Sequence, residues 1–312
     1  MTEPPTRTSQ PGRLSPKEPL VTGLGTRAKE NAAIARERER DDLDRKRAEL
    51  QLKLFPNWPD DRRGAPNTVI RAAVFGVVRR GRRIRVADLP IAAPEGWSVT
   101  LTGWRLDQSD CDLWLEVMHL ARATKPGESL RFTLHTMLRR LGRKGDGGED
   151  RRWLFRRLKG LTETTLSFES ERFVGSSGSL LGSFRIDKRS GEAVIQTNPQ
   201  VRSLFESVTH LDVERRRSLG GNQLAKAMHA MLSSHADWLP MKIETVMRRV
   251  GADYAQVKFF RRDLKAILMD FERRGWIDAW EIKDGDLLHI ALRPSPTQLR
   301  LLSRHREAPV EG

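Results

Sequence analysis

The sequence has little cysteine and tyrosine and no long apolar run. Among 312 residues, Cys111 is the only cysteine, so no disulfide can form within the chain and no zinc site can be built from several thiolates. No stretch approaches the roughly 18 uncharged apolar residues that a membrane span requires. The first residues also lack the apolar core of a secretory signal. We therefore expect a cytoplasmic protein without a membrane partner.

Patterns typical of catalysis are also missing. The phosphate-binding pattern G-x-x-x-x-G-K-[ST] does not occur, and neither do H-E-x-x-H, G-x-S-x-G or clustered carboxylates. A strand-nicking initiator needs a tyrosine nucleophile and closely spaced histidine ligands, but Tyr254 is the only tyrosine and no His-x-His pair occurs. We predict that the chain is not an enzyme and uses no metal or cofactor. A nicking enzyme with Tyr254 as nucleophile stays open as an alternative.

Positive charge is abundant. The chain carries 56 Lys and Arg against 41 Asp and Glu, a formal net charge of +15. Residues 1–66 account for only +3 of this excess, so most of it lies on the part of the chain that can fold. Cationic side chains release condensed counterions when they meet phosphates, so this distribution indicates a polyanionic partner such as double-stranded DNA.

Composition divides the N-terminal part into segments. Residues 1–25 hold five of the 16 prolines and few large apolar side chains, which predicts a disordered tail. Residues 26–65 contain a charged, Ala- and Glu-rich stretch expected to form a solvated helix, then a short apolar peptide and a Pro-rich linker over residues 56–66. The compact part is expected to begin near Pro66.

Two similar successions of elements follow. Residues 67–78 and 97–106 have strand composition. After them we expect a helix capped by Asp110, two helices over 130–142 and 148–162, and a hairpin that turns at VGSSGS. The second half repeats helix, helix, long helix over 252–274 and a hairpin turning at Asp284-Gly285. We predict an α+β fold with tandem winged-helix domains at 66–205 and 206–293, followed by a tail over 294–312.

The third helix of each unit has an apolar seam and a basic face. In a helix-turn-helix this helix enters the major groove, where basic side chains meet phosphates and guanine edges. A basic face on a single helix is more often merely solvated, but two in equivalent places favour DNA contact. The predicted DNA-binding residues are Arg151, Arg152, Arg156, Arg157 and Lys159 in the first unit and Gln256, Lys258, Arg261, Arg262 and Lys265 in the second.

The hairpins and one short peptide are further candidates. Arg172 and Lys188 of the first hairpin could meet the DNA backbone, whereas Lys283 lies between acidic residues and is expected to contribute little. The peptide QLKLF comprises Gln51, Leu52, Lys53, Leu54 and Phe55. It could insert Leu54 and Phe55 into an apolar pocket of a partner, or it could be the apolar end of a helix folded back on the body.

These features together resemble the TrfA-type replication initiators of broad-host-range plasmids. The likeness runs from about residue 40 to 293, and its most specific parts are QLKLF at 51–55, NWPD at 57–60 and APNTVIRAAVF at 65–75. TGWRLDQSD and VGADYAQVKFF also match in character.

The resemblance implies a replication initiator. Such a protein binds direct repeats, called iterons, at a plasmid origin, helps to open the adjacent DNA, and recruits the host initiator ATPase and replicative helicase. It also implies that Gln51, Leu52, Leu54 and Phe55 dock on the host sliding clamp, with Lys53 a departure from the family pattern. A homodimer stays open as a further state. The alternative function is a tandem winged-helix transcription regulator.

Overall fold

The computed structural model describes residues 34–36, 38–42, 58–78, 83–93, 95–124, 128–145, 147–171 and 174–293. The chain divides into two compact units, Met1–Glu49 and Leu50–Gly312. In the first unit, residues 34–36 and 38–42 are helical and exposed, as the charged composition predicts. The predicted disordered tail, the peptide at 51–55 and the tail at 294–312 lie outside the described residues, as does Arg172.

The predicted linker before Pro66 is instead part of the folded body. Trp58 is 2 % exposed and stacks on Phe205 with ring centroids 5.9 Å apart. Strand β1 (Arg62–Pro66) then pairs antiparallel with β11 (Val208–Asp212). The prediction of a linker was wrong because the prolines and charges of this segment do not reveal that Trp58 has a pocket formed by residues far along the chain.

The next segment is also not the strand that its composition predicts. Residues 67–78 form a short helix α2 (Asn67–Ile70), a turn and a two-residue strand β2 (Phe75–Gly76), which pairs in parallel with β5 (Leu106–Asp107). The strand expected over 97–106 is present as β4 (Trp97–Trp104). It lies in a four-stranded sheet of order β3-β4-β7-β8, with β3 (Arg85–Ile91), β7 (Thr165–Ser170) and β8 (Val174–Ser179).

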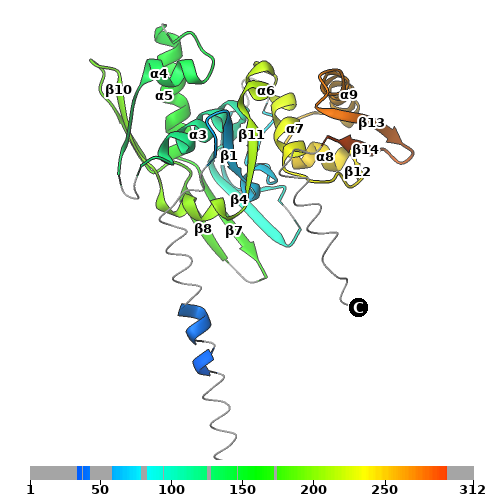
Figure 1. The fold of residues 1–312 in the computed structure, drawn as a ribbon, viewed down its shortest axis with the longest axis horizontal. Coiled ribbons are helices and arrows are strands. Elements are labelled where there is room, and N and C mark those ends of the chain that lie inside the picture. Colours follow the sequence, from blue (N-terminus) through cyan, green and yellow to red (C-terminus); the bar gives the residue numbers. More distant parts are fainter. Residues whose placement is uncertain are drawn as a thin grey trace, which may run out of the picture. The chain divides into compact units, whose positions relative to one another are not determined.

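All of these strands belong to the first half of the unit Leu50–Gly312, which also contains three α-helices and a small sheet (Figure 1). The helices are α3 (Gln108–Ala121), α4 (Leu134–Arg140) and α5 (Gly148–Thr162). The sheet has the order β6-β10-β9, with β6 (Leu130–Thr133), β9 (Ser183–Ile186) and β10 (Glu192–Gln196). Asp107 is the N-cap of α3, and Asp110, predicted as the cap, is the third residue and completes a capping box.

The hairpin next to α5 differs from the predicted one. The segment VGSSGS is strand β8 rather than a turn, and it pairs with β7. The hairpin in the sheet next to α5 is β9–β10, whose turn covers residues 187–191. Asp187 accepts hydrogen bonds from the backbone amides of Arg189 (2.7 Å) and Ser190 (3.0 Å), and Gly191 has a φ of 71°. Aspartate and glycine at these positions are typical of turns, so the residues of this segment themselves favour the turn.

The second half follows the same order of elements. After the 3₁₀ segment η1 (Pro199–Glu206) and β11 come α6 (Val213–Ser218), α7 (Gln223–Ser233), β12 (Met241–Lys242), α8 (Ile243–Arg249), α9 (Val257–Arg273), β13 (Ile277–Lys283) and β14 (Leu287–Leu292). The sheet order β12-β14-β13 corresponds to β6-β10-β9. In both halves the chain therefore runs helix, strand, helix, helix, hairpin, with the last strand in the centre of the sheet. The first half differs in one respect, because β7 and β8 of the four-stranded sheet come between α5 and the β9–β10 hairpin.

Two hydrophobic cores correspond to the two halves. The first contains Trp114, Leu154 and Phe205, and the second contains Trp238, Phe260 and Phe271. The boundary predicted between residues 205 and 206 does not coincide with the division of the cores, because Leu211 of β11 belongs to the first core. The chain is a mixed α+β protein in which β11 leads from one core to the other.

Polar contacts join the two halves. The buried side chain of Arg216 on α6 pairs with Asp112 of α3, and the ammonium group of Lys226 on α7 lies 2.6 Å from the same carboxylate. Burial opposes ionisation of Asp112, but the charges of Arg216 and Lys226 outweigh it and lower its pKa.

Gly76 and Gly251 let the two backbones approach, since a Cβ on Gly76 would lie 2.7 Å from the carbonyl oxygen of Gly251.

Candidate nucleic-acid interface

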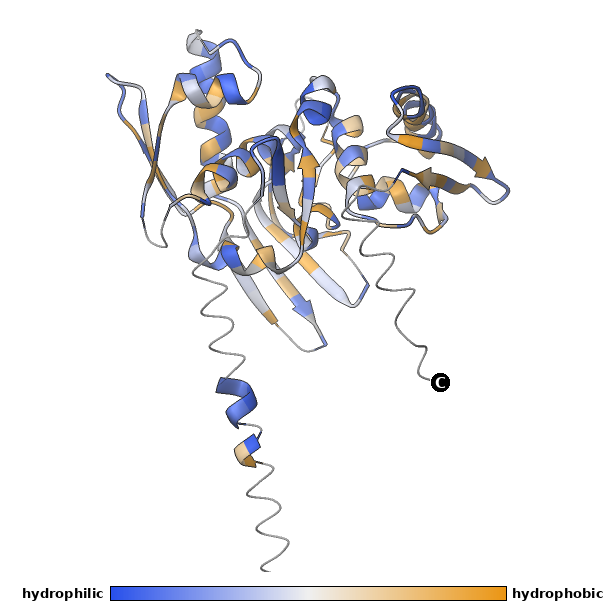
Figure 2. Ribbon diagram, in the orientation of Figure 1, coloured by the Kyte–Doolittle hydropathy of each residue, from blue (hydrophilic) through white to orange (hydrophobic). Residues whose placement is uncertain are grey.

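Helix α9 buries one face and exposes the opposite one. Phe260, Leu264, Ile267, Leu268 and Phe271 are buried at helical spacing and pack in the second core. The exposed side includes Lys258, Phe259, Arg262, Lys265 and Met269. Figure 2 shows hydrophilic and hydrophobic residues together on this helix. Since the apolar seam fixes the rotation of the helix, it also fixes which cations point to solvent.

The four predicted cations of α9 are not equivalent. Within the described residues, Lys258 and Lys265 have no carboxylate within ion-pair distance. Arg262 pairs with its neighbour Asp263 (2.8 Å) and remains 72 % exposed. Arg261 instead pairs with Asp286, at the turn between β13 and β14. Its charge is therefore compensated, and it ties the helix to the hairpin.

Gln256 occupies the N-cap position of α9. Its backbone is extended, with φ −146° and ψ 141°, and its side chain makes no capping hydrogen bond. The residue is exposed. Its amide is therefore not used to hold the helix start.

Helix α5 presents a second basic face. Leu154, Leu158 and Leu161 are fully buried, as the predicted seam requires. Four of the five predicted cations are exposed, namely Arg151, Arg152, Arg156 and Lys159. Glu149, in the first turn, pairs with Arg152 (3.1 Å) and Arg156 (2.9 Å), and these arginines lower its pKa through hydrogen bonds. Two guanidinium groups thus share one carboxylate, so the exposed face of α5 keeps a net positive charge.

Arg157 does not belong to that face. Its side chain is 14 % exposed, and Nη1 donates to Asp107 (2.8 Å) and Asp110 (2.9 Å) at the start of α3. The carboxyl group of Asp110 is completely buried, and burial together with the neighbouring Asp107 raises its pKa to about 6. The prediction that Arg157 widens the exposed basic surface is corrected here: the residue holds α5 against α3 from the inside.

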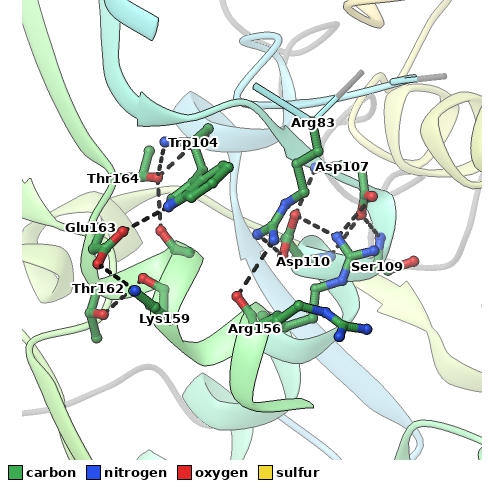
Figure 3. Close-up of polar contacts among 12 residues, drawn as sticks. Arg83, Trp104, Asp107, Ser109, Asp110, Arg156, Lys159, Thr162, Glu163 and Thr164 are labelled. Carbon is green, nitrogen blue, oxygen red and sulfur yellow. Dashed lines mark hydrogen bonds and ion pairs between the residues drawn. The ribbon is translucent and has the colours of Figure 1, made fainter. Parts of the chain in front are cut away.

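Further contacts fix α5 at its other end. Figure 3 shows Arg83 donating from Nη2 to Asp110 of α3 (2.9 Å) and from Nη1 to the backbone carbonyl of Arg156 in α5 (3.5 Å). Trp104 donates from Nε1 to Glu163, just after α5 (2.7 Å). Lys159 lies 3.7 Å from the same Glu163. The position of α5 is therefore set by buried and half-buried polar contacts as well as by its leucine seam.

A groove of about 420 Å³ separates α5 from the β9–β10 hairpin. It is lined by Leu134, Arg151, Arg152, Phe155, Arg156, Ile186, Asp187, Lys188 and Gly191. The predicted hairpin residue Lys188 therefore lies next to the cations of α5. Sequence reasoning missed Arg185 and Arg189 on this hairpin, both exposed. The Asp-x-x-Ser-Gly turn at residues 187–191 could have revealed the hairpin and hence these two residues.

Most of the chain is similar to known proteins. A family model described as TrfA protein matches residues 26–291. The chain belongs to the TrfA family. A plasmid replication initiator protein TrfA from Escherichia coli is 29 % identical over 258 residues, which cover 77 % of this chain and 65 % of that relative. The match thus spans slightly less than two thirds of the relative's length.

Solved structures also resemble this TrfA-family chain. Domains 2 and 3 of RctB match with a TM-score of 0.52 at 9 % identity, covering 74 % of this chain and 99 % of that one. At such low identity the likeness concerns the fold alone. The Pi initiator protein in complex with iteron DNA matches with a TM-score of 0.43 at 10 % identity, covering 58 % of this chain and 91 % of that one.

Tyr254, the alternative nucleophile, and Cys111, the single cysteine, both make contacts within the folded body. The hydroxyl of Tyr254 donates to Asp263 (3.0 Å), and its ring packs edge-on against Phe260. Cys111 is buried, which raises the pKa of its thiol to about 12. Within the described part of the chain, no group of three or more His, Cys, Asp or Glu side chains is placed to hold a metal ion. The same residues include no helix long and apolar enough to cross a membrane.

Proposed function

We propose that the chain is a plasmid replication initiator that binds direct repeats at a plasmid origin through two winged-helix domains. The observation that carries this proposal is the repeated order of elements, in which α5 and α9 each follow a short helix, precede a hairpin and expose a basic face. Membership of the TrfA family supports the same role. A helix in this position enters the major groove in winged-helix proteins.

The exposed cations would contact DNA from both helices. On α9, Lys258 and Lys265 carry charge that no carboxylate of the described residues compensates, and Gln256 would form paired hydrogen bonds with adenine. On α5, Arg151, Arg152, Arg156 and Lys159 face outward, with Lys188 nearby on the hairpin. Phosphate contacts of this kind would fix position and register, whereas Gln256 and its neighbours would read bases.

Other parts of the proposed role depend on partners. We propose no catalytic activity and no cofactor, so origin opening would rely on the host initiator ATPase and the replicative helicase. Gln51, Leu52, Leu54 and Phe55 would dock on the sliding clamp of the host polymerase. The protein would act in the cytoplasm and could exchange between monomer and homodimer.

A footprint of the full chain on DNA tests the central claim. On the origin of the plasmid that encodes it, we expect protection of about two major-groove segments per bound molecule, roughly 20 base pairs. A transcription regulator would instead protect a promoter with higher affinity than the origin. Equal affinity for the origin and for random duplexes of the same length would overturn the proposal.

Paired charge variants test the helix assignment. Lys258→Ala with Lys265→Ala should weaken origin binding and lower the slope of log affinity against log salt by about two. The matched control is Arg273→Ala with Arg293→Ala, which removes two cations that are 78 % and 62 % exposed and pair with Asp270 and Asp278. This control should change the salt slope much less.

A further inference from the structure

Two consecutive phenylalanines at the start of α9 have opposite surroundings. Phe260 is completely buried in the second core, whereas Phe259 is 39 % exposed. The exposed ring lies between two cations: Nζ of Lys258 is 5.1 Å from its centroid and Cζ of Arg262 is 5.8 Å away. The proposed DNA-facing surface thus contains an aromatic ring among its charges.

The position of Phe259 along the helix is important. It is the third residue of α9, and the first residues of a recognition helix are those that contact base edges. Met269 is also exposed, at 61 %, but ten residues further on it lies about 15 Å along the helix axis. On α5, the exposed Phe155 packs edge-on against Phe184, with centroids 5.6 Å apart, and therefore has an intramolecular role.

We propose that Phe259 reads the C5-methyl group of a thymine in the major groove, and is thus a specificity-determining residue of the site. This rests on the proposed function, because it requires α9 to lie in the groove. Among the bases of unmodified DNA only thymine carries an apolar group there, and phenylalanine is one of the side chains that contact it. Lys258 and Arg262, on either side of the ring, would hold the helix at the phosphates and keep the ring close to the bases.

The test begins with a library of random duplexes, which contains every candidate site whatever the sequence of the repeats. The full wild-type chain and the Phe259→Ala variant are each used to select bound duplexes, and the enriched sequences are compared. We expect the wild type to require thymine at one position of each site, and the variant to accept other bases there. Met269→Ala, which removes an exposed apolar side chain from the same helix, should keep the thymine preference.

Deoxyuridine then isolates the methyl group. In the selected duplex each thymine is replaced in turn by deoxyuridine, which lacks only the C5-methyl group. At one position the wild type should bind about fourfold more weakly, the effect of losing one buried methyl group. The Phe259→Ala variant should bind both duplexes equally, whatever its absolute affinity, so the ratio does not depend on a small loss of stability.

The outcomes separate this inference from the proposed function. If the wild type enriches a sequence but shows no sensitivity to deoxyuridine, or if Phe259→Ala retains the same ratio, the role of Phe259 is refuted and sequence-specific DNA binding stands. If the wild type enriches no sequence at all, the proposed function fails, and the role of Phe259 fails with it.

Discussion

The guanidinium group of Arg83 occupies the space that a side chain on Gly160 would need. A Cβ built on Gly160 would overlap Nη2 of Arg83, the atom that pairs with Asp110. Gly160 lies inside α5 and is buried, so the absence of a side chain is what allows Arg83 to reach the carboxylate beneath the helix. Gly160 therefore leaves room beside α5 for the contact between Arg83 and Asp110.

Gly160→Ala should lower the free energy of unfolding by about 1–3 kcal/mol, because the displaced Arg83 leaves Asp110 with one fewer partner. This loss should outweigh the helix propensity gained by replacing glycine. The control is Gly148→Ala on the same helix, where a Cβ would have no atom within 4 Å. Its stability should be unchanged or slightly higher. Urea unfolding measures both; equal stability of the two variants would contradict the role given to Gly160.

Neighbouring arginines on α5 should behave in opposite ways. Arg157→Gln should cost about 3 kcal/mol of stability, since it removes the cation shared by Asp107 and Asp110 and leaves Arg83 as the remaining ion-pair partner of the buried Asp110. The loss should be larger at pH 8 than at pH 5, because a pKa of about 6 means that Asp110 is largely protonated at the lower pH. Arg156→Gln should leave stability within about 0.5 kcal/mol of wild type and lower the salt slope of DNA binding by about one. The reverse pattern would show that the two assignments are exchanged.

His229 should make the second half sensitive to acid. It is buried on α7, and burial, with Arg216 and Arg215 nearby, lowers its pKa to about 3. In the unfolded chain the imidazole of His229 takes up a proton near pH 6.5, whereas in the folded chain it stays neutral until the pH approaches 3. The free energy of unfolding should therefore fall as pH decreases from about 6.5 toward 3, by at most about 1.4 kcal/mol per pH unit for this group.

His229→Leu should remove this contribution. Nδ1 of His229 has no hydrogen-bond partner among the described residues, so the substitution deletes no hydrogen bond there. Urea unfolding between pH 7.5 and 4.5 should give a flatter profile for the variant than for the wild type. Parallel profiles would mean that His229 is not the responsible group.

The peptide at residues 51–55 provides a prediction about a partner. Leu54→Ala with Phe55→Ala should abolish clamp binding, since each side chain would contribute about 1.5–3 kcal/mol when buried in a pocket. Origin binding should be unaffected. Calorimetric titration of purified sliding clamp with a synthetic peptide of residues 48–58 measures the interaction directly. If the peptide instead packs on the protein itself, it should give no heat, and the double variant should melt at a lower temperature.

Local patterns in the sequence predicted some elements well. The helix expected over 148–162 matches α5, because Leu154, Leu158 and Leu161 form a seam within a segment free of proline. The turn at Asp284-Gly285 was also predicted, since Gly285 adopts a φ of 76° that this pair favours. In both cases the residues that determine the structure lie within the segment itself.

The errors arose where distant residues determine the structure. Asn67 begins a helix in a segment of strand composition, and its side chain bonds to Ser207 and Thr209, about 140 residues away. Arg157 could not be distinguished from Arg156 by spacing, because its carboxylate partners lie 47 and 50 residues earlier. The basic faces could be predicted from periodicity, but which cations are compensated depends on tertiary contacts.

The pairing of β1 with β11 determines how mechanical load would enter the folded body. Residues before Trp58 connect to β1, and β1 is hydrogen-bonded along its length to the strand that leads from the first core to the second. A pulling force applied through the preceding residues would reach the buried Trp58 first and then this strand pair, before it reached α5 or α9. If a clamp moving on DNA pulled on residues 51–55, the tension would act first on Trp58 in the first core and next on the joint between the two halves.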